Sequence, residues 1–238
     1  MAFPWQNVLA APAFIINMDD CPDRMTLTET RVRAAGYTDV RRHGAVDART
    51  DNLSAEWAKY GSPAFDPHDR EFVQWPGKQA CELSWLAVLR RIQDEQIPFA
   101  TVFEDDVLFH KDFATLAPAF WERTPKDLDL CYLGCQLDAP SRLSCIDRAP
   151  AFCTHAIMLT LAGAKRVYDF ILGQPSGVYT IDCMLKNAEA SRACPFVYYV
   201  WNATSLPDPA AVMPKDWTKR NHGLVFQDYW LGTFVREW

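Results

Sequence analysis

Short apolar runs alternate with longer amphipathic stretches along this chain, and that alternation is what most constrains its fold. The apolar runs have the length and composition of buried strands, at residues 13–18, 39–48, 99–103, 128–134, 152–160 and 195–201. We expect helices between them, at residues 25–36, 78–96, 113–124, 161–173 and from about residue 180 to residue 191. Strands that alternate with helices predict an α/β fold of Rossmann type with a mostly parallel central sheet.

Three segments depart from this regular pattern. Residues 49–77 are polar and rich in Pro and Gly, so we expect a long loop with one short helix there. The helix at 113–124 contains Pro118, which predicts a break near that residue. Residues 202–238 are rich in Pro and aromatic residues and form an extension to a core at about 13–201. Because no linker interrupts the chain, we expect residues 1–238 to form a single domain.

Charge and apolar patterning exclude several classes of partner. The net charge is -6 and no run of Lys and Arg exceeds two residues, which argues against a nucleic-acid partner. No apolar run approaches the roughly 18 residues of a transmembrane segment, and the N-terminus lacks the basic start of a signal peptide. The eight cysteines predict free thiols in a reducing compartment, with a disulfide framework as the alternative. Together these features predict a cytoplasmic protein.

Three consecutive carboxylates, Glu104, Asp105 and Asp106, directly follow the predicted strand FATVF. Adjacent carboxylates repel one another, so they require either water or a cation. Ligands of open α/β sheets bind at the carboxyl ends of the strands, which is where this triplet falls. In an extended chain Glu104 and Asp106 would face one side, an arrangement suited to bridging Mg²⁺ or Mn²⁺ to a diphosphate. The alternative is an acidic turn whose side chains are solvated.

The order of short motifs resembles glycosyltransferase family 25, the relatives of lipopolysaccharide and collagen-type galactosyltransferases. The resemblance runs from about residue 13 to residue 190, and its blocks are FIINMDDCPDR, GAVDA, GKQACELSWLAVLRRI, VFEDDV, LDLCYLG, CTHAIMLTLAGAKRV and TIDCML. Ala48 and Ala80 stand where the family has Gly, and Ser84-Trp85 stands where it has Ser-His.

This resemblance implies an α/β domain of the GT-A type and a transferase that depends on Mn²⁺ or Mg²⁺. The donor would be a nucleotide-diphospho-sugar such as a UDP-sugar, and the acceptor a glycan or another hydroxyl group. The metal would act on the leaving diphosphate, with Glu104 and Asp106 as its ligands. Asp105 would orient the ribose or the waters of the metal. If the reaction inverts the anomeric centre, a carboxylate must take the acceptor proton.

Five further residues are candidates for holding the donor. Asn17 and Arg24 match the opening block of the family, and Arg24 would reach the phosphates or the base; the alternative is a turn Asn and a surface Arg. Asp47 would bind the uracil or the ribose, or it is an ordinary loop residue. Lys78 opens the long predicted helix, where it would form an anion site or lie in a solvated cap region. Ser84, one turn further on, would face the donor, or it is a small polar residue packed on the sheet.

Asp182 and His222 complete the candidate site. The family block TIDCML makes Asp182 the candidate catalytic base, although an Asp before a helix is commonly an N-cap. His222 would complete the metal shell, or it has a structural role. Two other functions stay open at this point. One is a metal-dependent phosphohydrolase that uses the same acidic edge, and the other is a non-catalytic descendant that binds a glycan.

Overall fold

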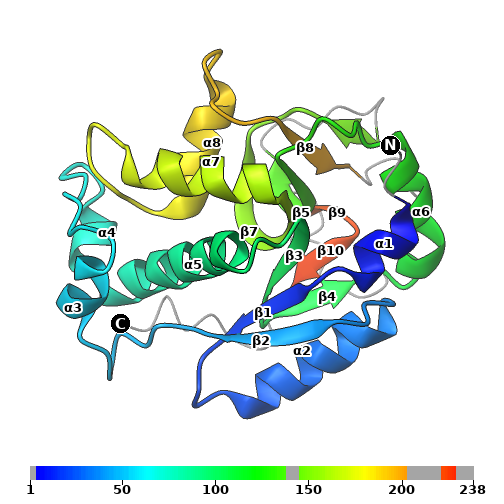
Figure 1. Cartoon of the computed structure of the whole chain (residues 1–238), viewed down its shortest axis with the longest axis horizontal. Helices are drawn as coiled ribbons and strands as arrows, with labels where there is room; N and C mark the ends of the chain where they lie inside the picture. The colour runs from blue at the N-terminus through cyan, green and yellow to red at the C-terminus, as the bar shows by residue number, and fades with distance from the viewer. Residues whose placement is uncertain (1–3, 138–144, 203–220, 229–238) are drawn as a thin grey trace.

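The computed structural model describes residues 4–137, 145–202 and 221–228, and Figure 1 shows how its elements are arranged. The helices are α1 (Trp5–Ala10), α2 (Pro22–Ala34), α3 (Leu53–Ala58), α4 (Arg70–Gln74), α5 (Pro76–Asp94), α6 (Phe113–Arg123), α7 (Leu161–Leu172) and α8 (Ile181–Ala190). The strands are β1 (Ala13–Asn17), β2 (Val40–Gly44), β3 (Phe99–Glu104), β4 (Val107–Phe109), β5 (Leu130–Leu137), β6 (Ile146–Asp147), β7 (Ala151–Thr160), β8 (Tyr198–Trp201), β9 (Asn221–Gly223) and β10 (Val225–Gln227).

A twisted eight-stranded sheet forms the centre of the described structure. Its strand order is β2-β1-β3-β7-β5-β8-β6, and β9 pairs with β5. Strands β2 and β3 are both parallel to β1, and β8 is parallel to β5. Strand β7 is antiparallel to both β3 and β5, so these two neighbours of β7 share one direction. The predicted α/β fold with a mostly parallel sheet is confirmed, and β7 is the antiparallel strand inserted in it.

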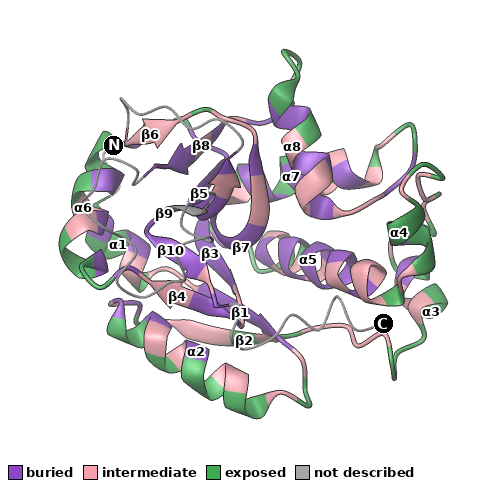
Figure 2. Cartoon of the chain, turned by 180° about the vertical axis from the view of Figure 1, so that it is seen from behind, coloured by how far each residue is buried: buried purple, intermediate pink, exposed green. Residues whose placement is uncertain are grey.

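Helices cover both faces of this sheet and enclose two apolar cores. Helices α5, α7 and α8 lie on one face, and α1, α2 and α6 lie on the other (Figure 1). The first core includes Leu83, Leu86 and Leu89 of α5, which are fully buried against the sheet. The second core includes Trp5 and Trp201, whose rings lie 5.9 Å apart. Figure 2 shows the buried sheet between helices that are exposed on their outer surfaces.

The register of three parallel strands brings the sequence motifs to one edge of the sheet. Ile16 of β1 is the partner of Glu104 of β3, and Asn17 is the partner of Gly44 of β2. The loops that follow β1 and β2 and the turn that follows β3 therefore start side by side. This is the carboxyl edge at which an open α/β sheet binds ligands.

Two local expectations differ from the structure. Residues 49–77 hold two short helices, α3 and α4, and the start of α5 at Pro76, where proline is favourable because the first helical position needs no N–H donor. The expected break at Pro118 is wrong, since α6 continues through it to Arg123. The buried residues Phe113, Ala117 and Trp121 hold α6 against the second core, which offsets the hydrogen bond that Pro118 cannot donate.

The described part of the C-terminal extension is built into the fold. Strand β9 extends the main sheet through β5, and β10 forms a separate antiparallel pair with β4. Gln227 of β10 is the partner of Val107, directly after the acidic triplet. The rest of the extension, 203–220 and 229–238, lies outside the described residues. Among the helices that the structure describes, none is both long and apolar enough to cross a membrane.

Candidate functional site

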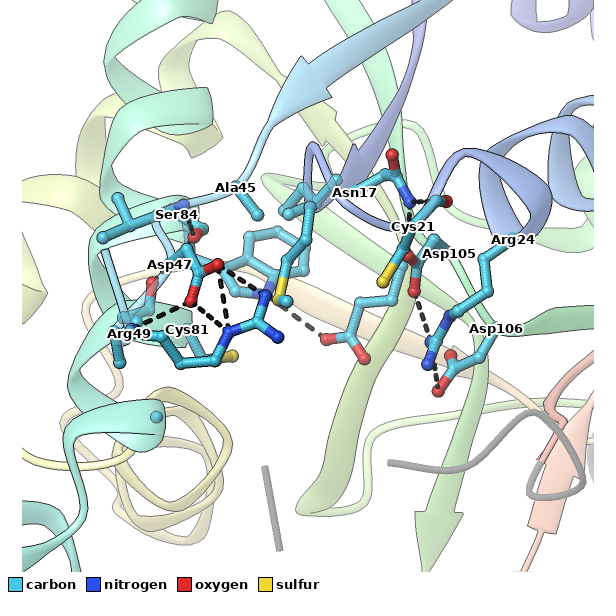
Figure 3. A pocket seen from close by; sticks show the side chains of 18 of the residues that line it. Asn17, Cys21, Arg24, Ala45, Asp47, Arg49, Cys81, Ser84, Asp105 and Asp106 are labelled. Carbon is cyan, nitrogen blue, oxygen red and sulfur yellow. Dashed lines mark hydrogen bonds and ion pairs between the residues drawn. The ribbon is translucent and has the colours of Figure 1, made fainter. Parts of the chain in front are cut away.

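An open pocket of about 860 Å³, a volume that includes solvent at its mouth, lies at the carboxyl ends of β1, β2 and β3. Seven of the predicted site residues line it: Asn17, Arg24, Asp47, Ser84, Glu104, Asp105 and Asp106. Cys21, Arg49, Cys81, Trp85 and Gln227 also line it. Figure 3 shows Asn17, Arg24, Asp105 and Asp106 on one side of the pocket and Asp47, Arg49, Cys81 and Ser84 on the other.

Asp105 is the centre of a polar network that joins β1, α2 and the turn after β3. Its Oδ2 accepts a 2.6 Å hydrogen bond from Asn17 Nδ2, and its Oδ1 accepts one from Arg24 Nη2. Thr28 of α2 donates a 2.7 Å hydrogen bond to the Asp105 backbone oxygen. Both oxygens of the Asp105 carboxylate are therefore in use. In this arrangement Asn17 and Arg24 contact the acidic triplet and hold it in place.

Asp106 is buried and has one carboxylate oxygen without a partner. Its Oδ2 accepts a 3.1 Å hydrogen bond from Gln227 Nε2 and lies 3.6 Å from Arg24 Nη2. Its Oδ1 is buried and has no hydrogen bond to any residue in the described part of the chain. Burial raises the pKa of Asp106, and the charge of Arg24 opposes that shift. A buried carboxylate oxygen without a donor is costly, and a cation in the pocket would satisfy it.

Glu104 is held from two different elements. Trp85 Nε1 of α5 donates to Glu104 Oε1 at 3.3 Å, and Thr154 Oγ1 of β7 donates to the same oxygen at 2.9 Å. Burial and the negative charge of Asp106 raise the pKa of Glu104, and the two hydrogen bonds oppose that rise. Glu104 Oε2 has no hydrogen-bond donor among the described residues.

The acidic triplet therefore does not alternate as it would in an extended strand. The chain turns at residues 105 and 106, and both of these carboxylates contact Arg24. Glu104, the last residue of β3, contacts a separate pair of donors. All three side chains nevertheless line one pocket.

The opposite wall is formed by the loop after β2 and the first turns of α5. Ser84 Oγ accepts a 2.9 Å hydrogen bond from the Val46 backbone N–H and donates a 2.7 Å bond to the Ala80 oxygen. Asp47 Oδ1 accepts a 2.8 Å hydrogen bond from Arg49 Nε, and this contact lowers the pKa of Asp47. Arg49 also donates to Asp20 in the loop after β1. Arg49 thereby links the two loops at the mouth of the pocket.

Lys78 and Asp182 do not line this pocket. Lys78 Nζ lies 2.5 Å from Glu71 Oε2 and 5.1 Å from the Trp75 ring centroid, so its ammonium group is directed toward α4. Asp182 lies in the first turn of α8, and its Oδ1 is buried without a hydrogen bond. Burial raises the pKa of Asp182, and the negative charge of Asp182 contributes slightly to the raised pKa of Glu104.

His222 lies in β9 with Cys135 of β5 as its backbone partner. Its side chain lies outside the described residues, so its role as a metal ligand stays a prediction. Within the described residues, no three His, Cys, Asp or Glu side chains gather as a ready-made metal centre. Among the described carboxylates that line the pocket, the oxygens without a hydrogen bond are Glu104 Oε2 and Asp106 Oδ1. Such a pair fits Mg²⁺ or Mn²⁺, because these ions use one or two carboxylates together with phosphate oxygens and water.

Sequence reasoning did not identify Arg49, Thr154 and Gln227 as residues at or next to the site. Arg49 follows Asp47 by two residues in a loop at the binding edge, and this position was a usable signal. The sequence around Gln227 carries no such signal, because this residue lies in a three-residue strand within an aperiodic segment. The position of Thr154 next to the site depends on the pairing of β7 with β3, which the local sequence does not specify.

A known protein family matches the sequence. The sequence model of glycosyltransferase family 25 (LPS biosynthesis protein) matches residues 10–136. No curated protein matches the sequence. Among solved structures, the chain is similar to a glycosyltransferase involved in the glycosylation of the major capsid of PBCV-1. The TM-score is 0.46 and the sequence identity 10%, and the match covers 82% of each chain.

The family match spans the edge that builds the pocket. It includes β1, the loops after β1 and β2, the first turns of α5 and the acidic triplet after β3. It also covers more than half of the 238 residues. The chain therefore belongs to glycosyltransferase family 25 and is a glycosyltransferase.

Proposed function

We propose that the protein transfers a sugar from a UDP-sugar to a glycan or another hydroxyl acceptor, with Mn²⁺ or Mg²⁺ bound beside the donor diphosphate. The observation that carries this proposal is the buried Asp106 Oδ1, which has no hydrogen-bond partner among the described residues and belongs to a pocket-lining carboxylate. The four carboxylates and two guanidinium groups of that lining give a net negative charge when all are ionised. An anionic diphosphate fits this lining when a divalent cation accompanies it.

Glu104 and Asp106 are the proposed ligands of that cation. When bound, a divalent cation supplies Lewis-acid stabilisation of the leaving diphosphate. Asp105 is proposed to keep the triplet in position, since Asn17 and Arg24 occupy both of its oxygens. Asp47 and Arg49, on the opposite wall, are proposed to contact the nucleoside and the phosphates. Donor binding, the role expected for Asp47, is thereby proposed for Arg49 as well, because Arg49 is held by hydrogen bonds to Asp47.

Asp182 remains the proposed general base of an inverting reaction. Its raised pKa makes it a better proton acceptor than an exposed carboxylate. Asp182→Asn should lower kcat at least about 100-fold while the affinity for UDP stays within about threefold of wild type. An unchanged kcat would remove Asp182 from the mechanism.

The test of donor and metal is thermal melting with UDP, GDP and CMP, each with and without Mn²⁺. A ligand that binds only the folded protein raises the melting temperature according to its concentration and affinity. The expected result is a shift with UDP that is large only when Mn²⁺ is present. A melting-temperature shift with UDP that is equal with and without Mn²⁺ would contradict the metal assignment. Release of inorganic phosphate without an acceptor would instead identify a phosphohydrolase.

A further inference from the structure

Glu104 is fixed by contacts that the proposed transfer reaction does not itself require. Two hydrogen bonds, from Trp85 and Thr154, converge on Oε1 of this carboxylate. The donors come from two different elements, since Trp85 lies on α5, which covers one face of the sheet, and Thr154 lies on the adjacent strand β7. Both donors are buried, with 2% of Trp85 and 4% of Thr154 exposed.

The backbone of β7 is irregular where it presents Thr154. The register between β5 and β7 shifts twice, between Tyr132 and Gly134 and again between Gly134 and Gln136. Next to Thr154, Cys153 has φ 68°, a left-handed conformation that residues with a side chain rarely adopt. Bulges of this kind redirect side chains, and strained backbone is retained where the surrounding structure requires it.

The two hydrogen bonds have a specific consequence for the other oxygen of the same carboxylate. A side chain held at Oε1 from two directions cannot rotate freely, so the position of Oε2 is fixed as well. Because Oε2 has no donor among the described residues and Glu104 lines the pocket, Oε2 is the oxygen available to a ligand. Outer hydrogen-bond partners of this type orient metal-binding carboxylates in other proteins.

We propose that Trp85 and Thr154 are positioning residues that hold Glu104 Oε1 and so present Glu104 Oε2 to the divalent cation. This inference rests on the proposed function and deepens it, because it assigns residues of α5 and β7 to the cation site. Neither residue touches the ligand through its hydrogen-bonding group, since both groups are used on Glu104.

The test measures the dissociation constant of Mn²⁺ by calorimetry in the presence of saturating UDP. Thr154→Val keeps the shape of the side chain and removes the hydroxyl, and Trp85→Phe removes the indole N–H. Each variant should weaken Mn²⁺ binding by about 10- to 100-fold. Thr154→Ser keeps the hydroxyl and should restore the affinity to within about threefold of wild type.

A matched control exists in the second core. Thr124 and Trp201 form a similar buried pair, in which Trp201 Nε1 donates to Thr124 Oγ1 at 3.0 Å. Thr124→Val should lower the melting temperature and leave the Mn²⁺ dissociation constant unchanged. This separates loss of stability from loss of positioning.

Three results would contradict the inference. Wild-type Mn²⁺ affinity in folded Trp85→Phe and Thr154→Val would overturn the positioning role while leaving the proposed function intact. A Thr154→Ser variant as weak as Thr154→Val would show that packing, and not the hydroxyl, matters at this position. If the wild-type protein itself binds no Mn²⁺ with UDP, the proposed function fails first, and the inference fails with it.

Discussion

Glu189, which lies far along the chain from the acidic triplet, gives a prediction whose size follows from the structure. It is a buried residue of α8, and its two carboxylate oxygens accept 2.8 Å hydrogen bonds from Tyr132 Oη and from the Ala151 N–H. Burial nevertheless raises the pKa of Glu189 from 4.5 to about 8. The folded state therefore holds a proton on Glu189 at pH values where the unfolded chain has lost it.

The sign of the effect on stability follows from this difference. The contribution of Glu189 to stability is fully present below about pH 4.5, and it is lost as the pH rises toward about 8. Since one pKa unit corresponds to about 1.4 kcal/mol, the full difference amounts to about 4 to 5 kcal/mol of unfolding free energy. A change of this size is a large part of the unfolding free energy of a typical domain.

Glu189→Gln replaces the titrating group with a neutral side chain that satisfies both neighbours. The amide oxygen would accept from Ala151 N–H, and the amide NH₂ would donate to Tyr132 Oη. At pH 5 the variant should be within about 1 kcal/mol of wild type, and at pH 9 it should be more stable by several kcal/mol. Urea unfolding at pH 5, 7 and 9 measures the difference in unfolding free energy between the two proteins. The contributions of all other titrating groups cancel in this difference, because both proteins share them.

The control for this experiment is Glu122→Gln on the exposed surface of α6. Surface substitutions of this kind change stability by less than about 0.5 kcal/mol. A stability difference between Glu189→Gln and wild type that does not change from pH 5 to pH 9 would show that Glu189 does not titrate with a raised pKa in the folded state. So would a variant that becomes less stable than wild type as the pH rises.

Two further predictions concern the backbone and the mouth of the pocket. Gly134→Ala should destabilise the fold by about 3 kcal/mol in urea unfolding, because the new Cβ would lie 1.7 Å from the Val225 backbone oxygen. Gly44→Ala is the control, since its new Cβ would lie 3.9 Å from Asp19 Oδ1, and equal effects of the two substitutions would contradict this prediction. Arg49→Ala should weaken UDP binding about tenfold at low salt and less at high salt, because Asp47 would lose its partner beside an anionic ligand. Titration calorimetry at two salt concentrations measures this, and a salt-independent effect would argue against electrostatics.

The position of the acidic triplet was predictable from the sequence, because the apolar run before Glu104 identifies a buried strand and its end identifies the binding edge. Asn17 was predictable for the same reason, since it ends the first strand. Both inferences use only strand location and the general geometry of α/β sheets. Those rules hold wherever the hydrophobic pattern is clear.

Other features depend on contacts between distant segments, and the local sequence does not contain them. Lys78 lies in the first turn of α5, a position that predicts an anion site, but its ammonium group forms an ion pair with Glu71 of the preceding helix α4. The expected alternation of the three carboxylates ends at Glu104, because the chain turns at residues 105 and 106. Arg24 contacts the carboxylates of both Asp105 and Asp106. Thr154 reaches Glu104 only because β7 runs antiparallel beside β3.

Asp106 and Glu104 are the residues that we propose to bind a divalent cation together with the donor diphosphate. The most direct measurement is the affinity of UDP with and without Mn²⁺, by titration calorimetry, for wild type and Asp106→Asn. Asp112→Asn, an exposed carboxylate six residues further along, serves as the control. We expect Mn²⁺ to strengthen UDP binding at least about tenfold in wild type and in the control, and Asp106→Asn to abolish this gain. A folded Asp106→Asn protein that keeps the full effect of Mn²⁺ on UDP binding would contradict the claim.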